Sequence, residues 1–238
     1  METIARKATR KKSDLKRSEA KALFTLLEDP DPYIQKKVME RLSLLGEQSV
    51  PLLDEFREGL DDTEARKRIS DLIHKLTFYS FENEFLEHLE SGLDTCQKLE
   101  RILLLLCRFD NPTLRTELSR IQLDKMADRL RHSLAGSDGI TSTLALFSSY
   151  FFGQEYFRGA TDDYMHPDNS YLHKVLQRRT GIPISLSLVM IFVARRLGIQ
   201  VHGVNMPMHF LIRYEDEDDV VLMDPYNRGR VVTEDQCR

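Results

Sequence analysis

The sequence predicts an α+β protein, in which N-terminal helical repeats pack on a domain with one buried helix and a small antiparallel sheet. Up to about residue 78, apolar residues recur at helical spacing between short turns. Farther on, a helix that is apolar on every side precedes three short runs of strand-forming residues. We expect three parts: a basic flexible arm at 1–17, helical repeats at 18–78 and the α+β domain at 79–238.

The bulk composition excludes several classes of protein. The 238 residues carry 34 basic and 38 acidic side chains, a near balance that gives no general attraction to nucleic acid. The three cysteines, Cys96, Cys107 and Cys237, have no CxxC spacing, which predicts neither a disulfide framework nor a zinc site. The longest apolar runs are far shorter than the ~18 residues that cross a bilayer. We therefore expect a cytoplasmic protein with no membrane contact, metal or cofactor.

The first two parts of the chain differ in kind. Residues 1–17 hold seven Lys or Arg and no aromatic residue, so they form either a solvated arm or a basic tail for an anionic partner. From Asp31, and again from Asp62, a turn is followed by an apolar helical stripe. The segment LLEDPDPYIQKKVMERLSLLGEQSVPLLDEF resembles HEAT-type helical repeats. Such repeats bury their faces against neighbours, so two should pack on the next domain, as a partner-binding surface or as a cap.

Two apolar segments predict buried helices in the second domain. Leu99–Cys107 is apolar nearly all round, which places Cys107 in the core. In the second segment Gly181-Ile-Pro183 turns the chain, and a helix runs from Ser185 to Leu197 before Gly198 stops it. Ser185 is either a helix cap or, at the positive end of the helix dipole, a nucleophile.

Three strands are expected after this helix, at 201–204, 209–214 and 220–224, with the acidic run Glu215–Asp219 as a solvated hairpin tip. His209 opens the second strand and Asp224 closes the third. A buried helix followed by an antiparallel sheet is the core of papain-like enzymes. There a strand histidine is the base and an Asp or Asn on the next strand orients it. Alternatively, His209 is a core histidine and Asp224, which precedes a proline, starts a turn.

The register of this hairpin decides whether His209 and Asp224 can meet. Side chains on one face repeat every second residue, and antiparallel partners keep a constant sum of residue numbers. A four-residue loop, Glu215–Asp218, pairs Tyr214 with Asp219 and places His209 directly opposite Asp224. A loop one residue longer would put the two side chains on opposite faces. We expect the four-residue loop, or a bulge with the same effect.

Four segments of the second domain are similar to the SirB-type family of transglutaminase-like proteins: LLLLCRFDNP, DDYMHPDNSYLHKVLQRRTGIPISLSL, ARRLGIQVHGVNMPMHFLIR and DPYNRGR. The resemblance spans roughly Glu82 to Arg238. It implies a bacterial cytosolic protein that often carries helical repeats, and a relation to a domain of certain F-box proteins. It also implies that His209 and Asp224 are the family's histidine and aspartate. Relatives usually continue into further helices, so the sequence is expected to be a piece of a longer protein.

Two departures from the family pattern bear on the site. Counting back from Leu197-Gly198 puts the cysteine position of transglutaminases near Pro183, so the nucleophile is missing, and the first hydroxyl after it is Ser185. The family usually has glycine where this chain has Met208, whose larger side chain is expected to crowd the site. The remaining side chains expected around the cleft are Asn169, Ser170, Asn205 and Tyr226, of which the first two could instead cap a helix.

Two functions are consistent with these patterns. The first is a non-catalytic regulatory module that holds a protein or peptide through the remnant cleft and the helical repeats. The second is an acyl-transfer or hydrolytic enzyme with Ser185, His209 and Asp224 as nucleophile, base and orienting group. No cysteine-dependent transglutaminase or protease activity is expected, because none of the three cysteines can reach the helix start.

Overall fold

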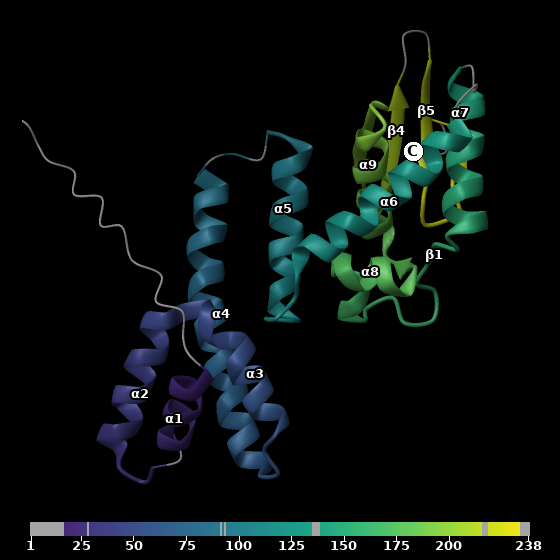
Figure 1. Cartoon of the computed structure of the whole chain (residues 1–238). Helices are drawn as coiled ribbons and strands as arrows, with labels where there is room; N and C mark the ends of the chain where they lie inside the picture. The colour runs from purple at the N-terminus through teal and green to yellow at the C-terminus, as the bar shows by residue number, and fades with distance from the viewer. Residues whose placement is uncertain are drawn as a thin grey trace, which may run out of the picture. The chain divides into compact units, whose positions relative to one another are not determined.

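The computed structural model describes residues 17–27, 29–90, 92, 94–134, 139–215 and 219–233. The chain separates into two compact units, Met1–Glu84 and Phe85–Arg238. Figure 1 shows the helices and strands of both. The basic arm expected at 1–17 lies outside the described residues except for Arg17, which begins the first helix.

The first unit consists of helices, which are α1 (Arg17–Leu27), α2 (Pro32–Leu45), a 3₁₀ helix (Gly46–Ser49), α3 (Val50–Glu58) and most of α4 (Thr63–Glu90). The carboxylates of Asp31 and Asp62 each accept a hydrogen bond of 2.9 Å from the backbone N–H two residues later. Matching caps of this kind begin α2 and α4. The apolar faces meet in a core that includes Phe24, Leu42 and Leu53. The HEAT-like character of this unit, and its packing on the second unit, stay predictions.

The second unit contains the remaining helices: α5 (Cys96–Leu106), a 3₁₀ helix (Cys107–Phe109), α6 (Thr116–Leu134), α7 (Ile140–Ser148), a π-helical segment (Ser149–Gln154), a 3₁₀ helix (Pro167–Asn169), α8 (Leu172–Arg178) and α9 (Pro183–Arg196). Helix α9 is buried along most of its length. It begins two residues before the expected Ser185, because proline suits the first helical position, where its missing N–H needs no partner. Within the described part of the chain, no helix combines the length and apolar character that a membrane span requires.

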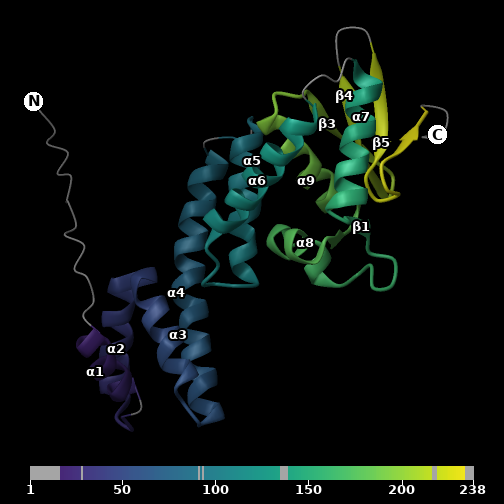
Figure 2. The same cartoon turned by 45° about the vertical axis from the view of Figure 1, so that its right-hand side comes forward.

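Four antiparallel strands form the sheet of this unit, in the order β3 (Val201–Met206), β4 (His209–Glu215), β5 (Val220–Asp224) and β6 (Arg230–Val232). A separate parallel pair joins β1 (Arg158–Gly159) to β2 (Thr180–Gly181). Helices α9 and α7 lie beside the strands in both views (Figures 1 and 2). Ile212, Tyr214 and Met223 share a core with these helices, and the Tyr214 ring lies 5.6 Å from that of Phe147 in α7.

The β4–β5 register differs from the expected one by two residues. Glu215 pairs with Val220, and Tyr214 pairs with Val221 where Asp219 was expected. The sum of paired residue numbers is therefore 435 (215 + 220), not 433. A slip of two residues leaves every side chain on its predicted face, because the strand period is two. His209 and Asp224 thus share a face, but they are offset diagonally and not directly opposite.

Candidate functional site

The site is centred on a hydrogen-bonded pair from adjacent strands. Nε2 of His209, at the start of β4, lies 2.9 Å from Oδ2 of Asp224, at the end of β5. The imidazole is 28% exposed and the carboxylate is 9% exposed. When Nε2–H donates to the carboxylate, Nδ1 keeps its lone pair and can accept a proton or a ligand's hydrogen bond.

The Asp224 carboxylate is held by the turn that follows it. Its Oδ1 accepts hydrogen bonds from the backbone N–H groups of Tyr226 at 3.0 Å and Asn227 at 3.2 Å. Its Oδ2 accepts a further one from Nδ2 of Asn227 at 2.7 Å, in addition to that from His209. Asp224 therefore combines the two alternatives open at the sequence level, because it starts a turn and orients the imidazole as well.

Tyr226 joins this pair to the rest of the domain. Its ring meets the His209 ring edge to face at 6.1 Å, and it meets the Tyr164 ring in the same way at 6.1 Å. Its hydroxyl donates to the carbonyl of Ala160 at 2.8 Å. Burial and the neighbouring Tyr164 phenol raise the pKa of Tyr226. A side-chain carbon at Gly159 would come within 2.6 Å of the Tyr226 ring, so glycine is required there.

A path of contacts leads from this ring to the start of α9. The Ala160 N–H donates to the Gly181 carbonyl at 2.9 Å, beside the β1–β2 pair. Gly181 precedes Pro183, the first residue of α9, by two positions. Hydrogen bonds thus link Tyr226 to the segment before α9, although His209 lies on the sheet face opposite the one that packs on α9. Sequence reasoning missed Tyr164, Gly159 and Ala160, which carry no periodic signal; the local density of aromatics and glycines was the only indication.

The hydroxyl of Ser185 bonds to groups other than His209 and Asp224. The side chain is 3% exposed at the third position of α9. Its hydroxyl donates to the Asn169 carbonyl at 2.7 Å and accepts from the Ile182 N–H at 3.0 Å, as in one half of a capping box. No hydrogen bond joins it to His209 among the described residues. Ser185 therefore has the geometry of a helix cap, and its action together with His209 and Asp224 stays a prediction.

Asn169 lies in the interior and supports the loop that carries Tyr164. It is 1% exposed, and its Nδ2 donates to the carbonyls of Asp163 at 2.6 Å and Tyr164 at 3.3 Å. Its Oδ1 accepts from Arg178 at 3.3 Å. The amide has no donor left for a ligand. It does not cap α8 either, whose N-cap is Tyr171.

Ser170 and Asn205 form no hydrogen bond with His209 or Asp224 among the described residues. Ser170 is exposed and lines an apolar hollow of about 230 Å³ to which His209 does not contribute. Asn205 is exposed on β3 opposite Phe210, which places it on the other face of the sheet from His209. Strand alternation separates Asn205 from His209.

Met208 does not crowd the site, contrary to expectation. Its side chain is 99% exposed. Pro207 and Met208 form the two-residue turn between Met206 and His209, and Met208 has φ of 59°. A proline followed by positive φ is the pattern of a type II turn, in which glycine is favoured at the second position. The glycine implied by the family resemblance is thus explained by the backbone, not by space around His209.

The cysteines offer no substitute nucleophile within the described residues. Cys107 is 1% exposed, its thiol lies 3.2 Å from the Leu103 carbonyl, and burial raises its pKa, so it is a packed core residue. Cys96 is half-buried at the start of α5, and Cys237 lies outside the described residues. The described residues also contain no group of three or more potential metal ligands.

Comparisons with known proteins relate this domain to one family. The profile of the Transglutaminase-like superfamily matches residues 117–238. A UPF0162 protein of Xylella fastidiosa is 37% identical over 135 residues, 57% of this chain and 48% of that protein. A UPF0162 protein of Vibrio cholerae is 26% identical over 125 residues, which are 52% of this chain and 46% of that protein. Human F-box only protein 21 is 39% identical over 94 residues, which are 36% of this chain and 15% of that protein.

The chain spans about half the length of the first of these relatives, and no solved structure matches it. The profile match covers just over half of the chain and includes the whole site from Gly159 to Asn227. The chain therefore belongs to the Transglutaminase-like superfamily.

Proposed function

We propose that the chain is a non-catalytic, SirB-type member of this superfamily that binds a protein or peptide segment at the His209–Asp224 site. In this proposal it works in the cytoplasm, and its N-terminal helices are a HEAT-like second contact surface. The observation that carries the proposal is the state of Ser185. Its hydroxyl is buried and bonded to Asn169, so the imidazole has no hydroxyl or thiol partner among the described residues.

The surroundings of His209 suit recognition of a chain segment. The Nδ1 atom can accept a hydrogen bond from a backbone or side-chain N–H. Apolar side chains next to the paired rings are exposed: Tyr164 at 43%, Met165 at 85% and Met208 at 99%. Thioether and aromatic groups of this kind are typical of surfaces that bind varied peptides.

The enzyme alternative requires the Ser185 hydroxyl to exchange its hydrogen-bond partners. Ser185 would have to leave the Asn169 carbonyl and the Ile182 N–H to reach His209. Each buried partner left unsatisfied costs about 1–3 kcal/mol. A serine also needs a base bonded to it, because its hydroxyl is not ionised near neutrality.

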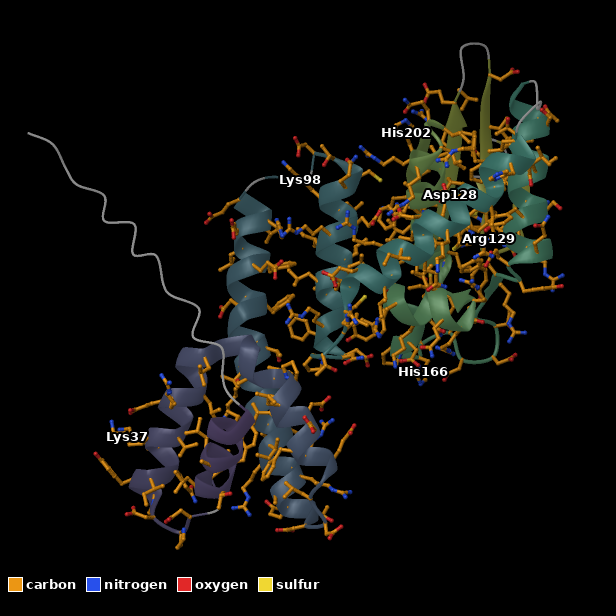
Figure 3. The ribbon with its side chains drawn as sticks, in the orientation of Figure 1. Lys37, Lys98, Asp128, Arg129, His166 and His202 are labelled. Atoms are coloured by element: carbon orange, nitrogen blue, oxygen red, sulfur yellow. The ribbon has the colours of Figure 1, made fainter. Side chains whose placement is uncertain are left out.

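Selection from a random peptide library, followed by binding measurements on the selected peptides, tests the proposal. His209→Ala should weaken binding about tenfold, as expected for the loss of one hydrogen bond and a ring contact. His202→Ala is the matched control, because His202 is exposed on the same face of the sheet (labelled in Figure 3), and it should bind like the wild type.

A fluorophosphonate probe tests the alternative on the same preparations. We expect no specific labelling of Ser185. Labelling that disappears in both Ser185→Ala and His209→Ala, together with ester turnover, would replace the binding module with a serine enzyme.

A further inference from the structure

A second hollow in the Phe85–Arg238 unit shares no residue with the His209 site. It has a volume of about 680 Å³ and lies where α5, α6 and the end of α9 pack together. Small-molecule sites typically have volumes of ~300–1,000 Å³. Five of its lining side chains are basic: Lys98, Arg101, Arg120, Arg195 and Arg196. Three are carboxylates, so the lining carries two net positive charges.

Two of the five cations are already paired with carboxylates: Nζ of Lys98 lies 2.7 Å from Asp94, and Arg196 is bonded to two carboxylates of the lining. The two terminal nitrogens of Arg196 donate to Glu100 at 2.7 and 2.8 Å, and its Nε donates to Asp124 at 2.6 Å. Burial alone would lower the pKa of Arg196, but the hydrogen bonds to Glu100 and Asp124 outweigh it and raise the pKa above its usual value. This cluster of one guanidinium and two carboxylates keeps one net negative charge, and it forms part of the lining of the hollow.

Two guanidinium groups that line the hollow, those of Arg120 and Arg195, have N–H donors without a hydrogen-bond acceptor among the described residues. Arg195 is exposed at the end of α9, and its guanidinium makes no hydrogen bond or ion pair with any residue that the structure describes. Nε of Arg120 lies 3.8 Å from Glu100, beyond hydrogen-bond distance, and its side chain is 64% exposed. A guanidinium presents five N–H donors in a planar fork that matches a phosphate group better than an ammonium does.

The helix ends add smaller and opposing contributions. Lys98 lies in the first turn of α5, where the positive end of the helix dipole favours an anion (labelled in Figure 3). The end of α9 places a negative dipole end nearby. Each is a partial charge, smaller than the full charge of an exposed arginine such as Arg120 or Arg195.

We propose that this hollow binds a small phosphorylated ligand, with Arg120 and Arg195 holding the phosphate. The chemistry is common to free pyrophosphate and to phosphate esters, and the remaining volume accommodates an organic group. This site is independent of the peptide site proposed above.

Isothermal titration of the whole chain with pyrophosphate, adenosine triphosphate and adenosine tests the proposal at low and physiological salt. Both phosphorylated probes should bind with Kd below about 1 mM at low salt and more weakly as salt rises, and adenosine should not bind. If adenosine triphosphate binds more tightly than pyrophosphate, the ligand is a phosphate ester. If the two affinities are equal, the site recognises the phosphate alone.

The double variant Arg120→Ala/Arg195→Ala should bind pyrophosphate at least about tenfold more weakly, because two charge-assisted contacts are removed. Both side chains are exposed, so the far-UV circular dichroism should not change. The control is Lys125→Ala, an exposed cation of α6 outside the hollow, which should bind like the wild type. The proposal is overturned by no pyrophosphate binding at millimolar concentration, by double-variant binding within twofold of wild type, or by tighter binding of a Glu-rich peptide.

Discussion

Asp224 accepts four hydrogen bonds, two of them from the backbone N–H groups of Tyr226 and Asn227. Replacing it with alanine leaves these donors without an acceptor in a partly buried turn. We expect Asp224→Ala to lower the free energy of unfolding by about 2–4 kcal/mol in urea titrations. The exposed Asp162 provides a control, and Asp162→Ala should stay within about 0.5 kcal/mol of wild type. Equal effects of the two substitutions would show that Asp224 does not hold the turn.

Met208 offers a test of backbone strain without a change in packing. Its side chain is 99% exposed and its φ is 59°. Positive φ costs a non-glycine residue about 1–2 kcal/mol, whereas glycine loses about 0.5–1 kcal/mol through the entropy of the unfolded chain. We therefore expect Met208→Gly to raise the midpoint of thermal unfolding slightly.

Met165→Gly is the matched control for this prediction. Met165 is 85% exposed, and its φ is not positive. Here glycine relieves no strain, so the same substitution should lower stability by about 0.5–1 kcal/mol. The two variants should thus differ in sign, and a loss of stability in both would exclude strain at Met208.

At the scale of elements, the sequence predicted side-chain faces well where apolar and polar residues alternate with a short period, as they do in strands. Strand alternation, together with the choice of the four-residue loop, predicted that His209 and Asp224 share a face, and that result does not change when the register slips by two residues. The register itself depends on how Glu215 and Val220 pair at the hairpin end, and residue types do not decide this. The two-residue strands β1 and β2 could not be predicted either, since they are too short to show a pattern.

The direction of the Ser185 hydroxyl was also beyond sequence reasoning. Its acceptor is the carbonyl of Asn169, which lies 16 residues earlier and comes close only in the folded chain. The absence of a cysteine near Pro183, in contrast, is read directly from the sequence. Contacts between distant segments therefore account for most of what was missed.

The start of α9 gives a prediction about coupling between two residues. A side-chain carbon at Gly181 would lie 2.5 Å from the Ser185 hydroxyl oxygen. Gly181→Ala should therefore lower the free energy of unfolding by about 1–3 kcal/mol, and Ser185→Ala by about 1–2 kcal/mol. The double variant should cost about 1 kcal/mol less than the sum, because the atom that clashes has been removed.

Gly153→Ala is the control for the glycine substitution. The nearest atom to its added carbon is 3.9 Å away, so stability should change by less than about 0.5 kcal/mol. Strict additivity of Gly181→Ala and Ser185→Ala would mean that the clash is relieved in some other way than by displacing the hydroxyl.

At the scale of the whole molecule, each unit has its own cluster of buried apolar residues. The packing of the first unit on the second is a prediction that hydrogen exchange can test. Leu53 is fully buried in the first unit, and Leu53→Ala should cost about 2–5 kcal/mol there. If the units pack closely, amides of α6 and α9 lose protection as well. Loss of protection confined to α2 and α3 would contradict the prediction.

Stability should also depend on pH through His173. Its side chain is 8% exposed on α8, with Nε2 3.2 Å from Asp110. Burial lowers its pKa from the usual 6.5, and Asp110 opposes this only in part. The unfolded chain therefore binds a proton first, so stability is lost as pH falls below about 6.5.

Urea titrations at pH 7 and at pH 5.5 measure this loss. His173→Gln should make the decrease smaller, since the titrating group is absent. His202→Gln, at an exposed histidine, should leave the decrease unchanged. An equal pH dependence in wild type and His173→Gln would show that the burial of His173 does not contribute.

The contact of Tyr214 with Phe147 has an optical consequence. The chain has no tryptophan and eight tyrosines, so its near-ultraviolet absorption comes mainly from phenols. Burial raises the pKa of Tyr214 far above its usual value, because the phenolate would have to form in the core. In alkaline solution this phenol stays protonated, while exposed phenols ionise to the phenolate. Burial and a hydrogen bond to Glu155 also raise the pKa of Tyr150, which lies in the same buried cluster. A late step in the phenolate absorbance would therefore mark the opening of this shared core, without any label on the protein.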